Sequence, residues 1–224
     1  MSCHGRKIKP GRAQLCQRWT VGLRPDMLAA MEGPTDEELM RAAGAGDEAA
    51  FASLVRRHQD LVYGTAYKML GSYHQEAEDV AQQVFIKVHR AAPRWQPQAK
   101  FTTWLLTICR HCVFTQLKRS KRRASEPLEP EGADGEPAES PYPDPEARAA
   151  DALLLEEEMR RELEAAMGAL PEAQRAALVL RQYDQLDYET IAQVMGTSVP
   201  SVKSLLFRAR EALRSRLHQY LHET

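Results

Sequence analysis

A proline-rich, acidic segment near the middle of the chain limits the fold more than any other feature of the sequence. Residues 124–147 contain six prolines and almost no large apolar side chain. Proline removes a backbone donor and ends helices, so such a segment cannot form part of a packed core. We predict that residues 124–151 form a flexible linker between one domain at 35–123 and a second at 152–224. Residues 1–34 have six basic side chains and no apolar period, which predicts a disordered arm.

Both predicted domains carry apolar residues at helical spacing, and no segment alternates convincingly with the period of two that a strand needs. Capping and helix-breaking residues divide this pattern into elements. The expected starts are Thr35 with Glu38, Asp47, Asp187 and Ser198, and the expected ends are Gly71, Pro93 and Gly196. One of these helices should run from about residue 74 to 92. The pattern predicts an all-α fold class, with two small helical domains joined by an acidic, proline-rich linker.

The last two predicted helices, separated by a tight turn at Gly196, have the arrangement of a helix-turn-helix, which places its second helix in a DNA major groove. Apolar residues are spaced to seal the angle between the two helices. The exposed positions of the second helix are basic or short and polar, a composition suited to phosphate and base contacts; they are Ser201, Lys203, Ser204, Arg208 and Arg210. A helical hairpin with a solvated basic face remains the alternative interpretation.

Charge is unevenly distributed along the chain, although the formal net charge is only -1. Residues 80–125 contain ten cations and no acid, whereas residues 124–158 contain twelve acids and one cation. Aromatic residues lie among the cations at Trp95, Phe101, Trp104 and Phe114. Aromatic rings beside backbone-binding cations are typical of surfaces that bind single-stranded DNA. Most single tryptophans at helical spacing are core residues, so composition alone favours a core position for Trp104 over a DNA-binding one.

Other classes of protein fit the sequence poorly. No stretch approaches the ~20 apolar residues of a membrane span, and the four cysteines are too few for a disulfide scaffold, so we expect a cytoplasmic protein. Cys109 and Cys112 flank His111, but a zinc site needs about four ligands, and we predict that both cysteines are core residues. His218 and His222 are expected to be solvated. Without a phosphate-binding loop or an activated nucleophile, we predict no catalysis, no metal and no cofactor.

Several motifs in order resemble one known family. They are the run DVAQQVF at residues 79–85, then FTTWLLTICRHC with the basic end of the same helix, and finally LPEAQRAALVL with YETIAQVMGTSVPSVKSLLFRAREALR. Together they are similar to bacterial RNA polymerase sigma factors of the extracytoplasmic-function (ECF) group. The resemblance covers about residues 36–122 and 150–218.

The resemblance implies a subunit that binds core RNA polymerase, recognises a two-part promoter and helps to open the duplex, with an anti-sigma factor as a further partner. It implies three sets of site residues. The polymerase-binding set is Asp79, Gln82, Gln83 and Phe85. The set for melting and the minus-ten element is Phe101, Trp104, Arg110, His111, Lys118, Arg119, Arg122 and Arg123. The set for the minus-thirty-five element is Ser198, Pro200, Ser201, Lys203, Ser204, Arg208 and Arg210.

The chain departs from the family pattern at three places. Gln83 stands where the docking motif usually has Glu, which removes one charge from the polymerase contact. His111 and Thr115 replace the usual Asn and Asp of the strand-reading helix, which points to an atypical base preference. Pro200 and Leu205 replace the usual Gly and Arg of the recognition helix.

Two other functions compete with this interpretation. An ordinary helix-turn-helix repressor or activator would lack the first domain's polymerase-binding motif, and the first domain offers no ligand-pocket or phospho-acceptor motif. A protein-only partner, such as an anti-sigma factor or adaptor, fits poorly with ten cations in 46 residues. For the linker, we hypothesise that its acids screen the basic stretch until polymerase draws them away. Its expected span of roughly 30 Å permits, without fixing, promoter elements about two duplex turns apart.

Overall fold

A computed structural model describes residues 33–125 and 147–218 of the chain, and these residues contain helices and no strand. The predicted all-α class is confirmed. In chain order the elements are α3 (Asp36–Gly44), α4 (Glu48–Leu70), the 3₁₀ turn η1 (Gly71–Glu76), α5 (Ala77–Ala91), the 3₁₀ turn η2 (Ala92–Arg94), α6 (Phe101–Ser125), α7 (Ala147–Ala169), α8 (Glu172–Gln182), α9 (Tyr188–Met195) and α10 (Val199–Arg216).

The helix ends follow the capping chemistry that the sequence predicts. Thr35 and Glu38 form the capping box of α3, in which each side chain accepts the other residue's backbone N–H. Asp47, Asp187 and Ser198 cap α4, α9 and α10 in the same way, each accepting a backbone N–H three residues on. Gly196 ends α9 in the left-handed conformation, with φ 64° and ψ 40°. The turn between α9 and α10 therefore has its expected geometry.

Two boundaries differ from the predicted ones. The helix expected from residue 74 starts only at Ala77, because residues 71–76 form the 3₁₀ turn η1, in which the His74 ring lies 3.1 Å from the Gly71 carbonyl oxygen. Helix also occupies residues 124–125 and 147–151 of the range predicted as linker. Residues 147–151 contain three alanines, the strongest helix former, which explains the earlier start of α7. The rest of that linker and the arm at 1–32 lie outside the described residues.

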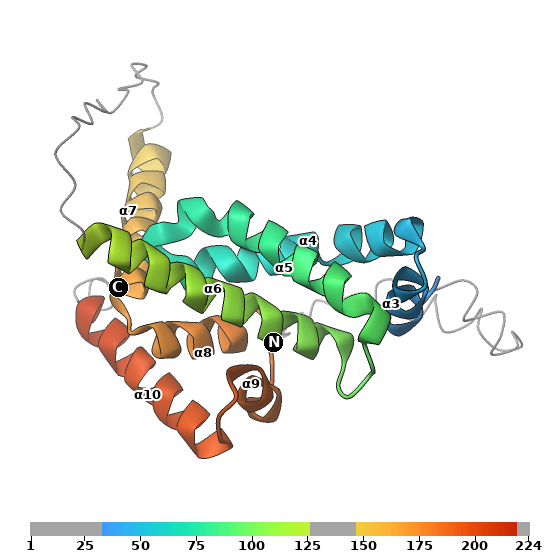
Figure 1. The fold of residues 1–224 in the computed structure, drawn as a ribbon. Coiled ribbons are helices and arrows are strands. Elements are labelled where there is room, and N and C mark those ends of the chain that lie inside the picture. The colour runs from blue at the N-terminus through green and yellow to red at the C-terminus, as the bar shows by residue number, and fades with distance from the viewer. Residues whose placement is uncertain (1–32, 126–146, 219–224) are drawn as a thin grey trace, which may run out of the picture.

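Helices α4, α5 and α6 run alongside one another, with α3 at one end and α7 at the other (Figure 1). On their lower side, α8 packs on α4 and α9 packs on α6, and α10 packs on α8 and α9. Buried apolar residues of α3, α4, α5, α6, α8, α9 and α10, together with Met167 of α7, form one continuous core. Cys109 and Cys112 are buried in it, as predicted, and burial raises the pKa of the Cys109 thiol. The domain boundaries stay a prediction.

Polar contacts join the two halves of this core. Arg175 of α8 is 4 % exposed, and its Nε donates to the Met69 carbonyl at the end of α4, 2.7 Å away. The same guanidinium donates to the carbonyls of Gly168 and Leu170, at 2.9 and 3.2 Å. Burial lowers the pKa of Arg175, and four carbonyl contacts in all accept from its Nε and Nη1 atoms. The C-terminal ends of α4 and α7 are thereby held together by one side chain.

Candidate functional site

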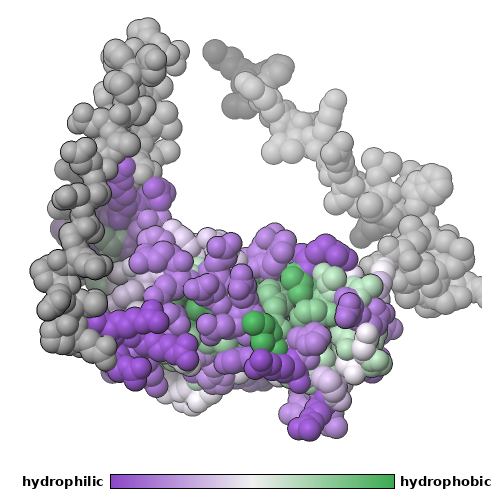
Figure 2. Space-filling model, turned by 45° about the horizontal axis from the view of Figure 1, so that its top comes forward, coloured by the Kyte–Doolittle hydropathy of each residue, from purple (hydrophilic) through white to green (hydrophobic). Residues whose placement is uncertain are grey.

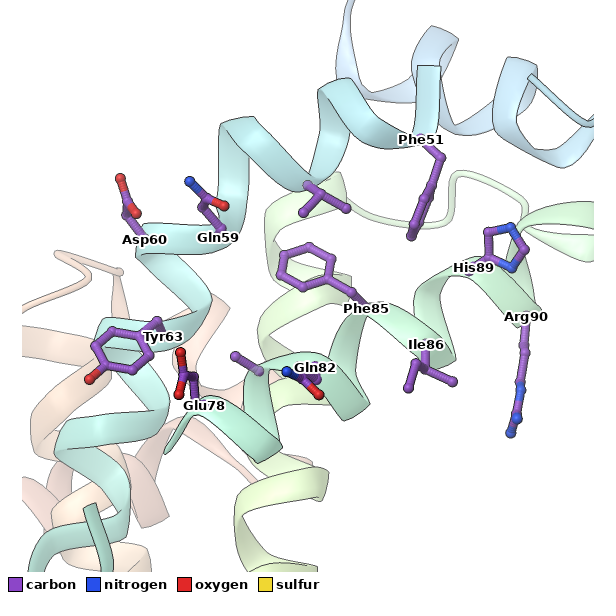
Figure 3. A pocket seen from close by; sticks show the side chains of 12 residues that line it. Phe51, Gln59, Asp60, Tyr63, Glu78, Gln82, Phe85, Ile86, His89 and Arg90 are labelled. Carbon is purple, nitrogen blue, oxygen red and sulfur yellow. The ribbon is translucent and has the colours of Figure 1, made fainter. Parts of the chain in front are cut away.

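The largest exposed apolar side chains of the first half lie around a groove between α4 and α5 (Figure 3). The groove has a volume of about 690 Å³. It is lined by Phe51, Val55, Gln59, Asp60, Tyr63, Glu78, Ala81, Gln82, Phe85, Ile86, His89 and Arg90. The space-filling view shows a patch of hydrophobic surface with hydrophilic surface around it (Figure 2).

The groove combines an apolar floor with charged ends. Phe51 and His89 meet edge to face across it at 4.8 Å, and Phe85 lies half-buried between the two helices (Figure 3). Tyr63 and Ile86 are 45 % and 49 % exposed, so the groove offers two large apolar side chains to solvent. Acidic residues lie near Tyr63 and basic ones near Ile86 (Figure 3). This combination suits an amphipathic helix of a partner protein.

The four residues expected to bind polymerase are divided by this geometry. Gln82 and Phe85 line the groove. Asp79 is exposed on α5 and Gln83 is half-buried, but neither lines the groove. The sequence reasoning missed Tyr63 and Ile86. Both could have been recognised in the sequence as large apolar side chains that lie outside the buried stripe of their helix.

A second cleft lies where α6 begins. Its lining includes Trp95, Trp104 and the cations Arg90, Arg94 and Lys100, and its volume is about 940 Å³. Trp104 contacts Trp95 and Phe101, with ring centroids 6.0 and 5.7 Å apart, and stays partly exposed. Phe101 is only 4 % exposed, so it supports the two tryptophans and offers no free face for a base. Trp104 is thus both a packing residue and an accessible aromatic surface.

Further along α6, an arginine and a histidine lie beside a phenylalanine ring. The Arg110 guanidinium lies over Phe114 at 5.4 Å, and its Nη2 is 2.5 Å from Nε2 of His111. Burial, with the charges of Arg110 and Lys87, lowers the pKa of His111, which favours the neutral form of its ring. With Nε2 accepting from the guanidinium, the ring proton is assigned to Nδ1. His111 therefore presents a single N–H donor.

The remaining predicted DNA contacts are on the surface. The basic end of α6 is exposed, at Lys118, Arg119, Arg122 and Arg123. On α10 the expected positions are exposed too, at Pro200, Ser201, Lys203, Ser204, Arg208 and Arg210. Ser198 is exposed, but its hydroxyl serves as the helix cap. Phe207, which the sequence reasoning did not single out, is 66 % exposed on the same helix and offers an apolar contact among these polar side chains.

Two other kinds of site, a metal-ion cluster and a membrane-spanning helix, are both absent from the residues that the structure describes. The described residues contain no group of three or more histidines, cysteines or acids that could hold a metal ion. Among the helices of residues 33–125 and 147–218, none has the length and apolar character needed to cross a bilayer.

Two family models and several known proteins are similar to this chain. Residues 54–123 match the Sigma-70 region 2 family, and residues 160–213 match the Sigma-70, region 4 family. The ECF RNA polymerase sigma factor SigE of Mycolicibacterium smegmatis is 36 % identical over 196 residues, which cover 85 % of this chain and 72 % of that protein. The ECF RNA polymerase sigma-E factor of Escherichia coli K12 is 33 % identical, covering 82 % and 94 %.

Solved structures give the same fold. CnrH, in complex with the cytosolic domain of CnrY, matches with a TM-score of 0.56 and 24 % identity, covering 82 % of this chain and 97 % of that one. RpoE from Bartonella quintana, in complex with the anti-sigma factor NepR, matches with a TM-score of 0.55 and 22 % identity, covering 75 % and 96 %.

Proposed function

This chain belongs to the ECF RNA polymerase sigma factors, and on that premise we propose which of its surfaces meet the polymerase, the promoter and an anti-sigma factor. As a sigma factor it binds core RNA polymerase and directs it to promoters. This membership argues against the two competing functions, a free-standing helix-turn-helix regulator and a protein-only adaptor. Since the polymerase catalyses RNA synthesis, we assign the chain itself no enzymatic activity. We further propose that it acts in the cytoplasm.

The groove between α4 and α5 is the proposed polymerase-binding surface. Its exposed Ile86 and Tyr63 carry this assignment, because a large apolar side chain in water is stabilised when a partner covers it. Gln82 and Phe85 contribute from the same groove. Asp79 and Gln83 do not line the groove. They would contact the part of the polymerase that lies just outside it. The charged ends of the groove would fix the direction in which a partner helix lies.

Two surfaces are proposed to read the promoter. Trp104 and its neighbouring cations bind the opened strand near the minus-ten element, with Phe101 acting as support. His111 and the basic end of α6 continue this surface. A neutral His111 would donate its one N–H to an acceptor atom of a DNA base. The exposed face of α10 enters the major groove at the minus-thirty-five element. There Lys203 and Arg208 supply phosphate or guanine contacts.

We propose that an anti-sigma factor is a further partner, as in the RpoE and NepR complex. The α4–α5 groove is its proposed binding surface as well, since one exposed apolar groove can serve both proteins in turn. Binding of either would exclude the other.

Binding to purified core polymerase tests the central assignment. Ile86→Arg places a charge in the apolar groove without removing a buried side chain, so we expect core affinity to fall at least tenfold while the helical circular dichroism is unchanged. Met159→Arg is the matched control, because Met159 is 47 % exposed on α7, outside the groove. Normal core affinity in the Ile86 variant would refute the assignment.

A further inference from the structure

The aromatic residues proposed to receive the opened strand rest on a buried histidine of another helix. We call Trp95, Phe101 and Trp104 the aromatic cluster, since their rings contact one another. Phe101 also packs on the ring of His58, with the two ring centroids 5.2 Å apart. His58 lies on α4 and is 6 % exposed. Because close-packed side chains cannot shift independently, the position of His58 helps to set that of Phe101 and, through it, that of Trp104.

A carboxylate of α3 fixes the orientation of this histidine. Nε2 of His58 lies 2.9 Å from Oδ2 of Asp36, and Oδ1 of Asp36 accepts from Nη1 of Arg57 at 2.6 Å. The Arg57 side chain is 41 % exposed and the His58 side chain only 8 %, so the contact with His58 is the buried one. A carboxylate accepts hydrogen bonds, so this contact assigns a proton to Nε2 of His58 and fixes which way the ring faces.

The other end of α3 supports the aromatic cluster from a second side. α3 lies at the end of the bundle where α6 begins (Figure 1), and its last residue, Gly44, packs on the turn η2. A Cβ added at Gly44 would lie 2.5 Å from the carbonyl oxygen of Ala92, so only glycine permits this close approach. The chain passes from η2 directly into Trp95, whose ring is 6.0 Å from that of Trp104.

The polar pair of α3 does more than attach this helix to the rest of the protein. Leu39 and Met40 already bury the apolar face of α3 in the core. Apolar packing leaves the rotation of a neighbouring ring less restricted than a directed hydrogen bond does, and supporting hydrogen bonds of this kind hold functional side chains in one geometry. Among the described residues that line the α4–α5 groove and the cleft beside Trp104, none belongs to α3.

Resting on the proposed function, we propose that α3 is a positioning element for promoter opening, in which Asp36 orients His58 and Gly44 seats η2. Together these contacts hold Trp95 and Trp104 in the geometry that receives an unstacked base. Asp36, His58 and Gly44 are positioning residues, because they act through the aromatic cluster and do not touch DNA. Their effect is confined to the step that opens the duplex, and binding of core polymerase and of the closed promoter does not depend on them.

Opening kinetics of the reconstituted holoenzyme test the role of Asp36. A 2-aminopurine base in the minus-ten element of a mapped promoter becomes brighter when it unstacks, and the dependence of this signal on holoenzyme concentration separates promoter affinity from the opening rate. We expect Asp36→Ala to slow opening about tenfold with promoter and core affinities unchanged. Asp36→Asn keeps an acceptor for His58 and should open at close to the original rate. Glu37→Ala is the matched control, because it removes an acid from the same first turn of α3 and leaves the contact with His58 in place.

A spectroscopic measurement distinguishes positioning from a general loss of structure. With Trp19→Phe as the background, Trp95 and Trp104 are the remaining tryptophans, and near-ultraviolet circular dichroism of the free chain reports their mutual geometry. Asp36→Ala should change this signal while the helical signal is constant, and Asp36→Asn should restore it. Normal opening by Asp36→Ala beside slow opening by Trp104→Ala, or equal slowing by Glu37→Ala, would refute the positioning role. Normal opening by Trp104→Ala would instead count against the proposed function.

A substitution at the other end of α3 provides a second test. Gly44→Ala forces α3 and η2 apart, so it should also slow opening with core affinity unchanged. Gly64→Ala is the matched control, because it adds the same methyl group to α4, where the nearest atom, Nζ of Lys68, is 3.6 Å away. Equal opening rates for these two variants would contradict the seating of η2 by α3.

Discussion

The Asp184 carboxylate should make the chain less stable at neutral pH than it would be with a neutral group at this position. Burial raises the pKa of Asp184 from 3.8 to about 6, although the Thr65 hydroxyl and the charge of Lys68 favour the ionised form. A raised pKa means that the folded chain holds this proton more tightly than the unfolded chain. The stabilising contribution is therefore complete below pH 3.8 and is lost as pH rises through about 6.

The expected magnitude follows from the size of this shift. A change of about two pKa units corresponds to about 3 kcal/mol. Because Asp184 is only partly buried, solvent screening reduces this figure, and we expect about 1–2 kcal/mol. Asp184→Asn keeps the shape of the side chain and an acceptor for Thr65 but cannot ionise. This variant should exceed the original chain in free energy of unfolding by that amount at pH 7.5.

Urea unfolding of both proteins at pH 7.5 and pH 4 measures the difference. The gap should shrink towards zero at pH 4, where the original carboxyl is protonated. Asp187→Asn is the control with the opposite sign, because hydrogen bonds from Thr190 lower the pKa of Asp187, so its contribution is present above pH 3.8 and fades with acid. A gap for Asp184→Asn that is equal at both pH values, or reversed at pH 7.5, would refute the reasoning.

Two further predictions concern the turn after α4 and the recognition helix. Gly71→Ala should lower the free energy of unfolding by about 1–3 kcal/mol in the same urea assay, because Gly71 has φ 60° and an added Cβ would lie 3.0 Å from the Arg175 guanidinium; unchanged stability would show that the turn relaxes freely. Lys203→Ala with Arg208→Ala should reduce transcription from a mapped promoter and lower the salt slope of DNA binding by roughly one unit for each lost phosphate contact, while core affinity stays normal; transcription at the original level would exclude α10 as the reader.

Local chemistry explains what the sequence could predict. Capping residues such as Thr35 and Ser198 act on backbone groups only three residues away, so helix starts can be inferred without knowing the fold. The left-handed conformation of Gly196 can also be inferred locally, because glycine adopts it without a steric cost. The exposed face of α10 follows from helical spacing once its buried residues are recognised.

Long-range packing explains what the sequence did not reveal. The bonds from Thr65 to Asp184 and from Arg175 to Met69 join residues more than 100 positions apart, and no periodic pattern signals such pairs. The burial of Phe101 is a similar case, because its neighbours Trp95 and His58 come from other elements. Equally, the groove at Ile86 is formed by residues of both α4 and α5, so it depends on how the two helices pack.

The length and rigidity of α6 have a consequence for the geometry of an opened promoter. This helix runs unbroken from Phe101 to Ser125, and its apolar stripe is buried along the core, so Trp104 and Arg122 belong to one rigid body. Eighteen residues of helix separate them, which corresponds to about 27 Å. At about 3.4 Å per base pair, this is roughly eight base pairs of duplex. In the proposed complex, where Trp104 contacts an unstacked base and Arg122 a phosphate, α6 would keep these two contacts at a fixed separation. No movement between the protein's halves could change that separation.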